Sequence, residues 1–179
     1  MLASLVQGPL LRLASAGLVL LALQRTLFSD LRPFGVVVQI MLALAAAAGA
    51  GGGPQKGALA GFVLGLMFDL GVGTPLGSSS ITMGIGGFVA GYVTSITIDP
   101  QWWLAALFTG VGAAAGEAGV PVVRSFIGEE STFSTRMFTI VPVVAAAAML
   151  ASPLFVPLGR WCMRVKRPEW KAPLEAAEA

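Results

Sequence analysis

Charge is nearly absent from the middle of this chain. Between residues 33 and 98 only Lys56 and Asp69 are charged. A soluble domain needs a polar surface and has roughly a quarter of its residues charged. Over all 179 residues, 11% are charged and 56% are apolar. The sequence therefore predicts an integral membrane protein.

Six apolar runs predict six membrane-spanning helices. A hydrocarbon core about 30 Å thick requires roughly 20 helical residues per crossing, so the chain has room for six crossings and no second globular domain. The runs cover residues 10–28, 35–50, 57–70, 81–98, 102–123 and 135–158. We expect an all-α polytopic membrane protein, with a six-helix transmembrane domain at residues 1–158 and a short basic tail at residues 159–179.

The distribution of Lys and Arg predicts the orientation in the membrane. An even number of spans places both termini on one side. With the termini inside, seven cations are cytoplasmic, five of them in the tail, and Arg25, Arg32, Arg124 and Arg136 lie outside. Because cytoplasmic segments of membrane proteins carry the excess of Lys and Arg, we expect both termini in the cytoplasm.

The composition excludes several kinds of chemistry. The chain has no His, which removes His-dependent nucleophiles, zinc proteolysis and haem ligation by His. The single Cys162 cannot form an internal disulfide, and its place in a basic tail suggests a reduced cytosolic residue. The positive net charge belongs mainly to the tail, so it does not indicate a nucleic-acid surface. We expect no catalytic residues, no metal site and no cofactor.

Small residues recur at helical spacing. Gly57, Gly61 and Gly65 share one helical face, and Gly87 and Gly91 repeat the four-residue interval. Without a hydrophobic driving force between helices in lipid, close backbone packing at small residues supports helix association. These glycines are predicted helix-packing positions, within the chain or towards a partner.

Three charged residues fall inside predicted spans. Arg25, Asp69 and Glu117 are each expected within about two turns of the outer membrane surface, because the first, third and fifth spans run in the same direction. An isolated charge in the membrane costs several kcal/mol. We therefore expect a polar cluster with Arg25 at its centre; alternatively Arg25 snorkels to the headgroups and Asp69 caps a loop.

The expected loop at residues 71–80 is uncharged and rich in Gly and Ser. Such a loop can form a tight re-entry or dock on a partner, and Pro75, Leu76 and Gly77 are its candidate contact residues. Its serines are more plausible as caps of the following helix than as nucleophiles, since the sequence offers no base to activate them.

Several of these motifs together resemble one family. The motifs are QRTLF at residues 24–28, GALAGFVLGLMFDL at residues 57–70, TPLG at residues 74–77 and GFVAGY at residues 87–92. Together they resemble the bacterial rod shape-determining protein MreD family over roughly residues 20–95. No motif of that family is present after Asp99.

The resemblance implies a non-enzymatic membrane scaffold subunit of the cell-elongation machinery, which organises lateral peptidoglycan synthesis and cell shape. The implied partners are membrane lipid, an MreC-like scaffold protein and, through it, MreB-like filaments, a RodA-like polymerase and an elongation-specific penicillin-binding transpeptidase. The resemblance also implies a location in the bacterial inner membrane. No nucleic acid is implied.

The family's fold is similar to that of the six-helix substrate-binding subunits of energy-coupling-factor vitamin transporters, so the alternative function is vitamin binding. Two features expected of such a subunit are missing. The first span has no AxxxA docking motif, and the chain has a single tyrosine, Tyr92, in place of a set of hydrogen-bonding aromatic residues. An intramembrane protease using Asp69 and Glu117 is a third and weaker alternative, because the residues before Asp69 lack the Gly-x-Gly-Asp pattern of such enzymes.

Overall fold

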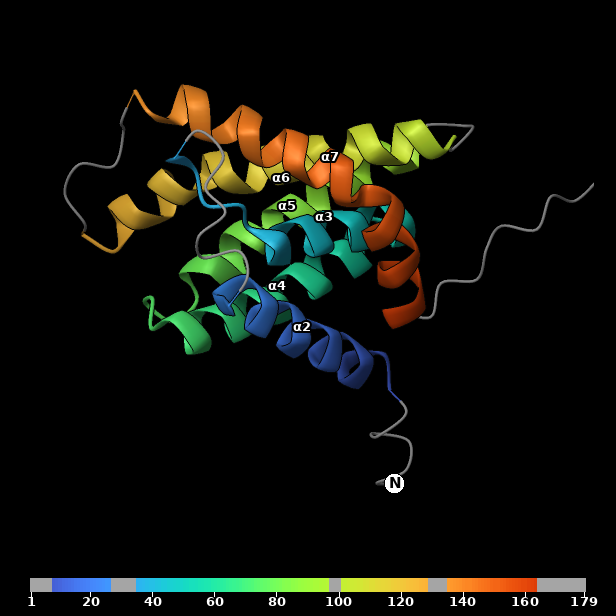
Figure 1. The fold of residues 1–179 in the computed structure, drawn as a ribbon, viewed down its shortest axis with the longest axis horizontal. Coiled ribbons are helices and arrows are strands. Elements are labelled where there is room, and N and C mark those ends of the chain that lie inside the picture. The colour runs from blue at the N-terminus through green and yellow to red at the C-terminus, as the bar shows by residue number, and fades with distance from the viewer. Residues whose placement is uncertain (1–7, 27–34, 97–100, 129–134, 164–179) are drawn as a thin grey trace, which may run out of the picture.

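The computed structural model describes residues 8–26, 35–96, 101–128 and 135–163. Every regular element in these ranges is a helix. The helices are α2 (Pro9–Thr26), α3 (Ile40–Gly52), α4 (Pro54–Val72), α5 (Ser78–Ile96), α6 (Trp102–Phe126) and α7 (Met137–Cys162). The protein is therefore all-helical, and each predicted apolar run overlaps one helix (Figure 1).

Four of these helices, α4 to α7, are long and apolar enough to cross a membrane. The helix α3 is apolar but has only 13 residues, which at 1.5 Å per residue span about 20 Å and not the roughly 30 Å of a hydrocarbon core. The helix α2 has 18 residues and includes Arg12 and Arg25. The structure thus supports a membrane protein with four candidate spans, and the expectation of six spans stays a prediction.

The short helix α3 lies at the centre of the bundle. It contacts each of the other five described helices, and Figure 1 shows it between α5, α4 and α7 while α2 lies at the edge. All its residues from Ile40 to Ala50 are buried. Because most of these side chains are Ala, five helices can approach the α3 backbone closely.

The second helix begins later than the sequence suggested. Residues 36–39 are not helical, and α3 starts at Ile40. Gly35 has a φ of 76°, and the three Val residues that follow it lose side-chain freedom in a helix. A helix was wrongly expected from Gly35 because apolar character alone does not distinguish helical from extended backbone.

Gly53 and Pro54 join α3 directly to α4. Gly53 has a φ of 89°, which favours glycine, and Pro54 is the first residue of α4, where a missing N–H costs no intrahelical hydrogen bond. The junction lets α4 fold back beside α3 without a longer loop.

The predicted glycine stripe faces α5. A Cβ added at Gly57 would overlap the Gly87 carbonyl, one at Gly61 would overlap the Met83 carbonyl, and one at Gly91 would overlap Gly53. Gly65 lies equally close to the backbone of Ser79 and Ser80. In the described structure these glycines therefore serve packing between α4 and α5, not an open surface.

The described cations gather at the two ends of the bundle. The Arg12 guanidinium lies 5.0 Å from the centre of the Trp161 ring, and Arg160 Nε donates to the Gly51 carbonyl at 3.3 Å. Arg25, Arg124 and Arg136 lie at the opposite end, which the α4–α5 loop also occupies. Lys56 follows shortly after Gly51 in the sequence, so the described cations divide evenly between the two ends. The prediction that the termini are cytoplasmic therefore depends on the cations of the tail, most of which lies outside the described residues.

The single cysteine lies in the last helix, which continues beyond residue 158. The helix α7 continues past residue 158 to Cys162, and Cys162 is fully buried. Its thiol lies 3.7 Å from the Arg12 carbonyl oxygen. Cys162 is therefore part of the helical bundle and not of an exposed tail.

Substituting Ala for Gly61 tests the close packing of α4 against α5. The new methyl group would overlap the Met83 backbone, and forced overpacking costs about 1–3 kcal/mol of unfolding free energy. The matched control is Gly84→Ala, because a Cβ there meets its nearest atom at an ordinary 3.6 Å. Thermal unfolding in detergent should show a clear loss for Gly61→Ala and none for Gly84→Ala; equal melting temperatures would contradict the packing.

Cysteine labelling of intact cells tests the predicted orientation. The background is Cys162→Ala, since a fully buried thiol reports on burial and not on sidedness. Single cysteines replace Ser125, exposed near the end of α6, and Gln55, exposed near the start of α4. We expect a membrane-impermeant maleimide to label Ser125→Cys in intact cells and Gln55→Cys only after permeabilisation. The reverse pattern would place the termini outside.

Candidate functional site

Asp69 organises the connection between α4 and α5. It is 1% exposed, and its carboxylate accepts hydrogen bonds from Thr74 Oγ1 at 2.6 Å, from the Gly77 N–H at 2.8 Å and from the Ser79 N–H at 3.2 Å. The last two donors come from the start of α5, where unpaired N–H groups favour a negative charge. These bonds compensate the buried charge and hold α5 in place.

The loop itself is shorter than the sequence predicted. The helix α4 continues to Val72, and α5 begins at Ser78, so the loop covers residues 73–77. Gly73 and Gly77 have φ values of 80° and 96°, a conformation that favours glycine. The two glycines turn the chain around the Asp69 carboxylate.

Arg25 binds the end of α4 and neither of the expected carboxylates. Its guanidinium Nη1 donates to the Gly71 carbonyl at 2.8 Å. Among the described residues no ion pair joins Arg25 to Asp69 or Glu117. The contact fastens α2, which otherwise lies at the edge of the bundle, to the segment that carries the loop. The structure thus gives Arg25 a positioning contact in place of the predicted neutralising one.

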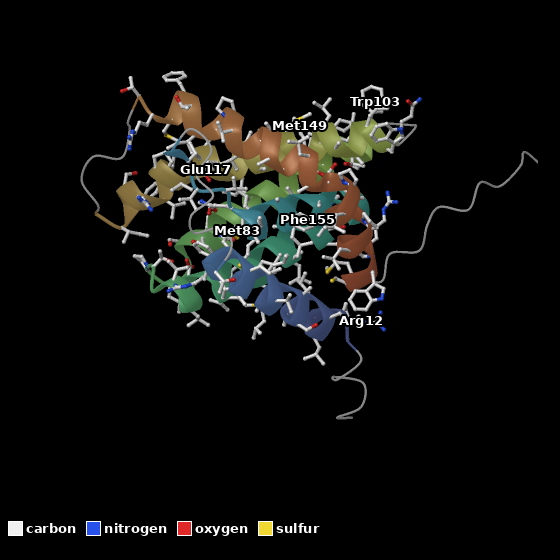
Figure 2. The ribbon with its side chains drawn as sticks, in the orientation of Figure 1. Arg12, Met83, Trp103, Glu117, Met149 and Phe155 are labelled. Atoms are coloured by element: carbon white, nitrogen blue, oxygen red, sulfur yellow. The ribbon has the colours of Figure 1, made fainter. Side chains whose placement is uncertain are left out.

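Glu117 has a different hydrogen-bond partner from the loop groups that bind Asp69. It lies on α6, is 8% exposed, and accepts a hydrogen bond at Oε2 from the Gln39 side-chain amide at 3.1 Å. Gln39 is the residue immediately before α3. This bond therefore joins the non-helical segment at residues 36–39 to α6. Figure 2 shows Glu117 and Arg12 towards opposite ends of the molecule.

Two cavities meet at Gln39. The larger, of about 360 Å³, is lined by both charged side chains Glu117 and Arg136, and otherwise by Gly35, Val36, Val37, Gln39, Thr139 and Ile140. The smaller, of about 90 Å³, includes Arg124 and the residues Thr74, Pro75, Ser78, Ser79 and Thr82 beside the Asp69 loop. The Gln39 side chain lies at the lining of both. This end of the bundle therefore holds the two acidic residues of the described ranges, Asp69 and Glu117.

The predicted site residues are partly brought together. Arg25, Asp69 and Gly77 belong to one hydrogen-bonded unit around the loop, whereas Glu117 has its own partner. Pro75 lines the smaller cavity, and Leu76 is 68% exposed. No hydrogen bond joins Asp69 to Glu117 in the described part of the chain, so the two acids do not form the shared pair that an aspartic protease requires.

Sequence reasoning missed Gln39 and Arg136. An uncharged Gln at the border of an apolar run is a usable signal, because its amide needs a partner once it is buried. Arg136 was considered only as one of the cations that predict the orientation of the chain in the membrane. Within the described ranges no three acidic, Cys or His side chains lie close enough together to hold a metal ion.

Comparison with family models, curated proteins and solved structures returns no match to this chain.

Double-mutant cycles on thermal stability in detergent test these partner assignments. Asp69→Asn should lower the free energy of unfolding by about 2–4 kcal/mol, because the new amide would face backbone N–H donors. Arg25→Leu should lower it by about 1 kcal/mol. Since both residues hold the same turn, their combined effect should be non-additive by about 0.5 kcal/mol or more.

Arg25→Leu combined with Glu117→Gln is the matched control. We expect additive losses within about 0.5 kcal/mol, because the two side chains share no partner. A larger coupling energy between Arg25 and Glu117 would support the predicted polar cluster centred on Arg25.

Proposed function

We propose that this chain is a non-enzymatic membrane scaffold subunit of the bacterial cell-elongation machinery, similar to MreD, in the inner membrane. Its role would be to hold an MreC-like scaffold, and through it MreB-like filaments, a RodA-like polymerase and an elongation-specific transpeptidase. This proposal rests on the sequence resemblance together with the arrangement of the residues that carry it.

The supporting observation is that those residues form one interlocked unit. Arg25, from the first motif, binds the backbone at Gly71. Asp69, from the second motif, binds the N–H of Gly77 in the third. Gly57 of the second motif packs against Gly87 of the fourth. Motifs that are separate in the sequence thus build a single element, which is the arrangement expected of a rigid docking platform.

The platform also presents apolar side chains outward. Leu70 is 71% exposed and Leu76 is 68% exposed, while the polar groups of the loop point inward to Asp69. A loop whose polar groups are already satisfied costs little further ordering on binding. Leu70 and Leu76 are therefore suited to contact a partner's transmembrane or juxtamembrane segment.

The cavity beside Glu117 favours a second candidate, a substrate-binding subunit of a vitamin transporter. A pocket of about 360 Å³ with two charged residues in its lining falls within the size range of small-molecule sites. The missing AxxxA motif in the first helix counts against docking to a transporter module. The two candidates differ in the proteins that should accompany the chain.

Co-purification in mild detergent from the native host distinguishes the two functions. We expect a single-span coiled-coil scaffold protein, and rounding of the cells when the chain is depleted. Leu76→Ala should reduce recovery of the scaffold about fivefold, as expected for loss of a contact worth about 1 kcal/mol.

The matched control is Leu154→Ala. Leu154 is 70% exposed but lies on α7, away from the loop, so recovery should be unchanged. Transporter ATPase modules or a bound vitamin would favour the second candidate, and cells that keep their rod shape on depletion would contradict the first.

A further inference from the structure

A largely apolar groove lies between α2 and α7, the first and the last of the described helices. Its volume is about 310 Å³. No residue of its lining is charged, and the lining consists of Ser15, Ala16, Val19 and Leu20 from α2 and Leu158 and Trp161 from α7. The α2 helix lies at the edge of the bundle (Figure 1), so the groove follows the contact between an edge helix and the rest of the fold.

A positive charge lies at one end of this groove. Helical residues three and four positions apart share a face, so Arg12 is on the same face of α2 as Ser15 and Ala16 of the lining. The Arg12 guanidinium lies 5.0 Å from the centre of the Trp161 ring, and Trp161 itself lines the groove. The cation is thus held beside the groove by a contact between the two helices that form it.

No carboxylate neutralises Arg12 in the described part of the chain. The two described acids, Asp69 and Glu117, lie at the opposite end of the bundle. The Trp161 ring attracts the cation through its π face, but a guanidinium also has five N–H donors, and no described residue accepts a hydrogen bond from them. Phosphate oxygens suit such a group, because a guanidinium can donate to two of them in parallel.

The position of the groove favours a lipid as the source of the phosphate. Trp residues and Arg residues near helix ends lie at the level of lipid headgroups, and Trp161 is 56% exposed. From Arg12 the groove runs along α2 as far as Leu20, which is about 12 Å at 1.5 Å per residue. A phosphate at Arg12 would therefore have an apolar channel for an attached acyl chain next to it, whereas a free phosphate would leave the channel unused.

We propose that the α2–α7 groove binds an anionic glycerophospholipid. The phosphate lies against the Arg12 guanidinium and accepts its hydrogen bonds, and one acyl chain lies along Ala16, Val19 and Leu158. Basic sites between membrane helices bind anionic headgroups in this way. The lipid then fastens the edge helix α2 to α7, a role that goes beyond the scaffold function and does not depend on it.

Native mass spectrometry of the full-length protein in mild detergent tests this assignment. The probes are phosphatidylglycerol and phosphatidylcholine with identical acyl chains, and the measured quantity is the dissociation constant of the first bound lipid. We expect phosphatidylglycerol to bind about fivefold more tightly, as for one Arg near an anionic headgroup. Phosphatidylcholine binds more weakly because its own ammonium offsets the charge of its phosphate.

Two variants and a matched control locate the site. Arg12→Gln should remove the preference for phosphatidylglycerol. Lys56→Gln removes the same charge at the same end of the bundle, but from a residue outside the groove lining, and should keep the preference. Val19→Trp places a large ring in the groove from a position that is 57% exposed and should weaken phosphatidylglycerol binding about fivefold. This variant decides the question if the Arg12 variant does not fold.

Glycerol 3-phosphate distinguishes a lipid from a soluble phosphate. At the concentration of the lipid it should not displace phosphatidylglycerol, because it lacks the acyl chain; displacement would overturn the assignment to a lipid. Equal binding of the two lipids by the native protein would overturn the proposal. So would a preference that survives Arg12→Gln, a preference that is lost equally in Lys56→Gln, or unchanged phosphatidylglycerol binding by Val19→Trp.

Discussion

Backbone contact among three glycines is the constraint on which the bundle depends. Gly49 of α3, Gly57 of α4 and Gly87 of α5 lie so close that a Cβ on any of them would overlap backbone atoms of another. In lipid, where burial of apolar surface provides little force between helices, such contacts gain dispersion energy along whole helix faces. The junction fixes α4 and α5 on α3, and α6 continues the pattern where Gly112 meets Gly86.

The helix axes fixed in this way determine which polar groups meet at the end of the bundle. With α4 and α5 locked together, Asp69 reaches the first N–H groups of α5 and needs no cation. With α3 at the centre, Gln39 precedes it at the level of Glu117 on α6. The two acids have separate partners: Asp69 accepts from backbone N–H groups and a hydroxyl, whereas Glu117 accepts from the Gln39 amide and interacts electrostatically with Arg124. The polar end is thus two neighbouring units and not one ionic cluster.

These two units suit two different tasks. The Asp69 unit satisfies its carboxylate within the chain and presents leucines outward, as expected of a surface that contacts a protein in the membrane. The Glu117 unit places a carboxylate and Arg136 in the lining of a cavity, as expected of a small-molecule site. The cavities beside the two units share Gln39 in their linings, so one amide side chain connects the two units.

Composition and spacing alone established the all-helical membrane character, because the absence of charge and the length of apolar runs are local properties. The same holds for the glycine spacing of α4 and the Gly-Pro break before it. Tertiary structure alone decided that α3 is a short central helix, since extended and helical Val segments have the same hydropathy. Tertiary structure also decided the partner of each charged residue. Arg25 was expected to neutralise an acid, but it donates to the Gly71 carbonyl. The partner depends on the rotation and depth of each helix, which the order of residues does not specify.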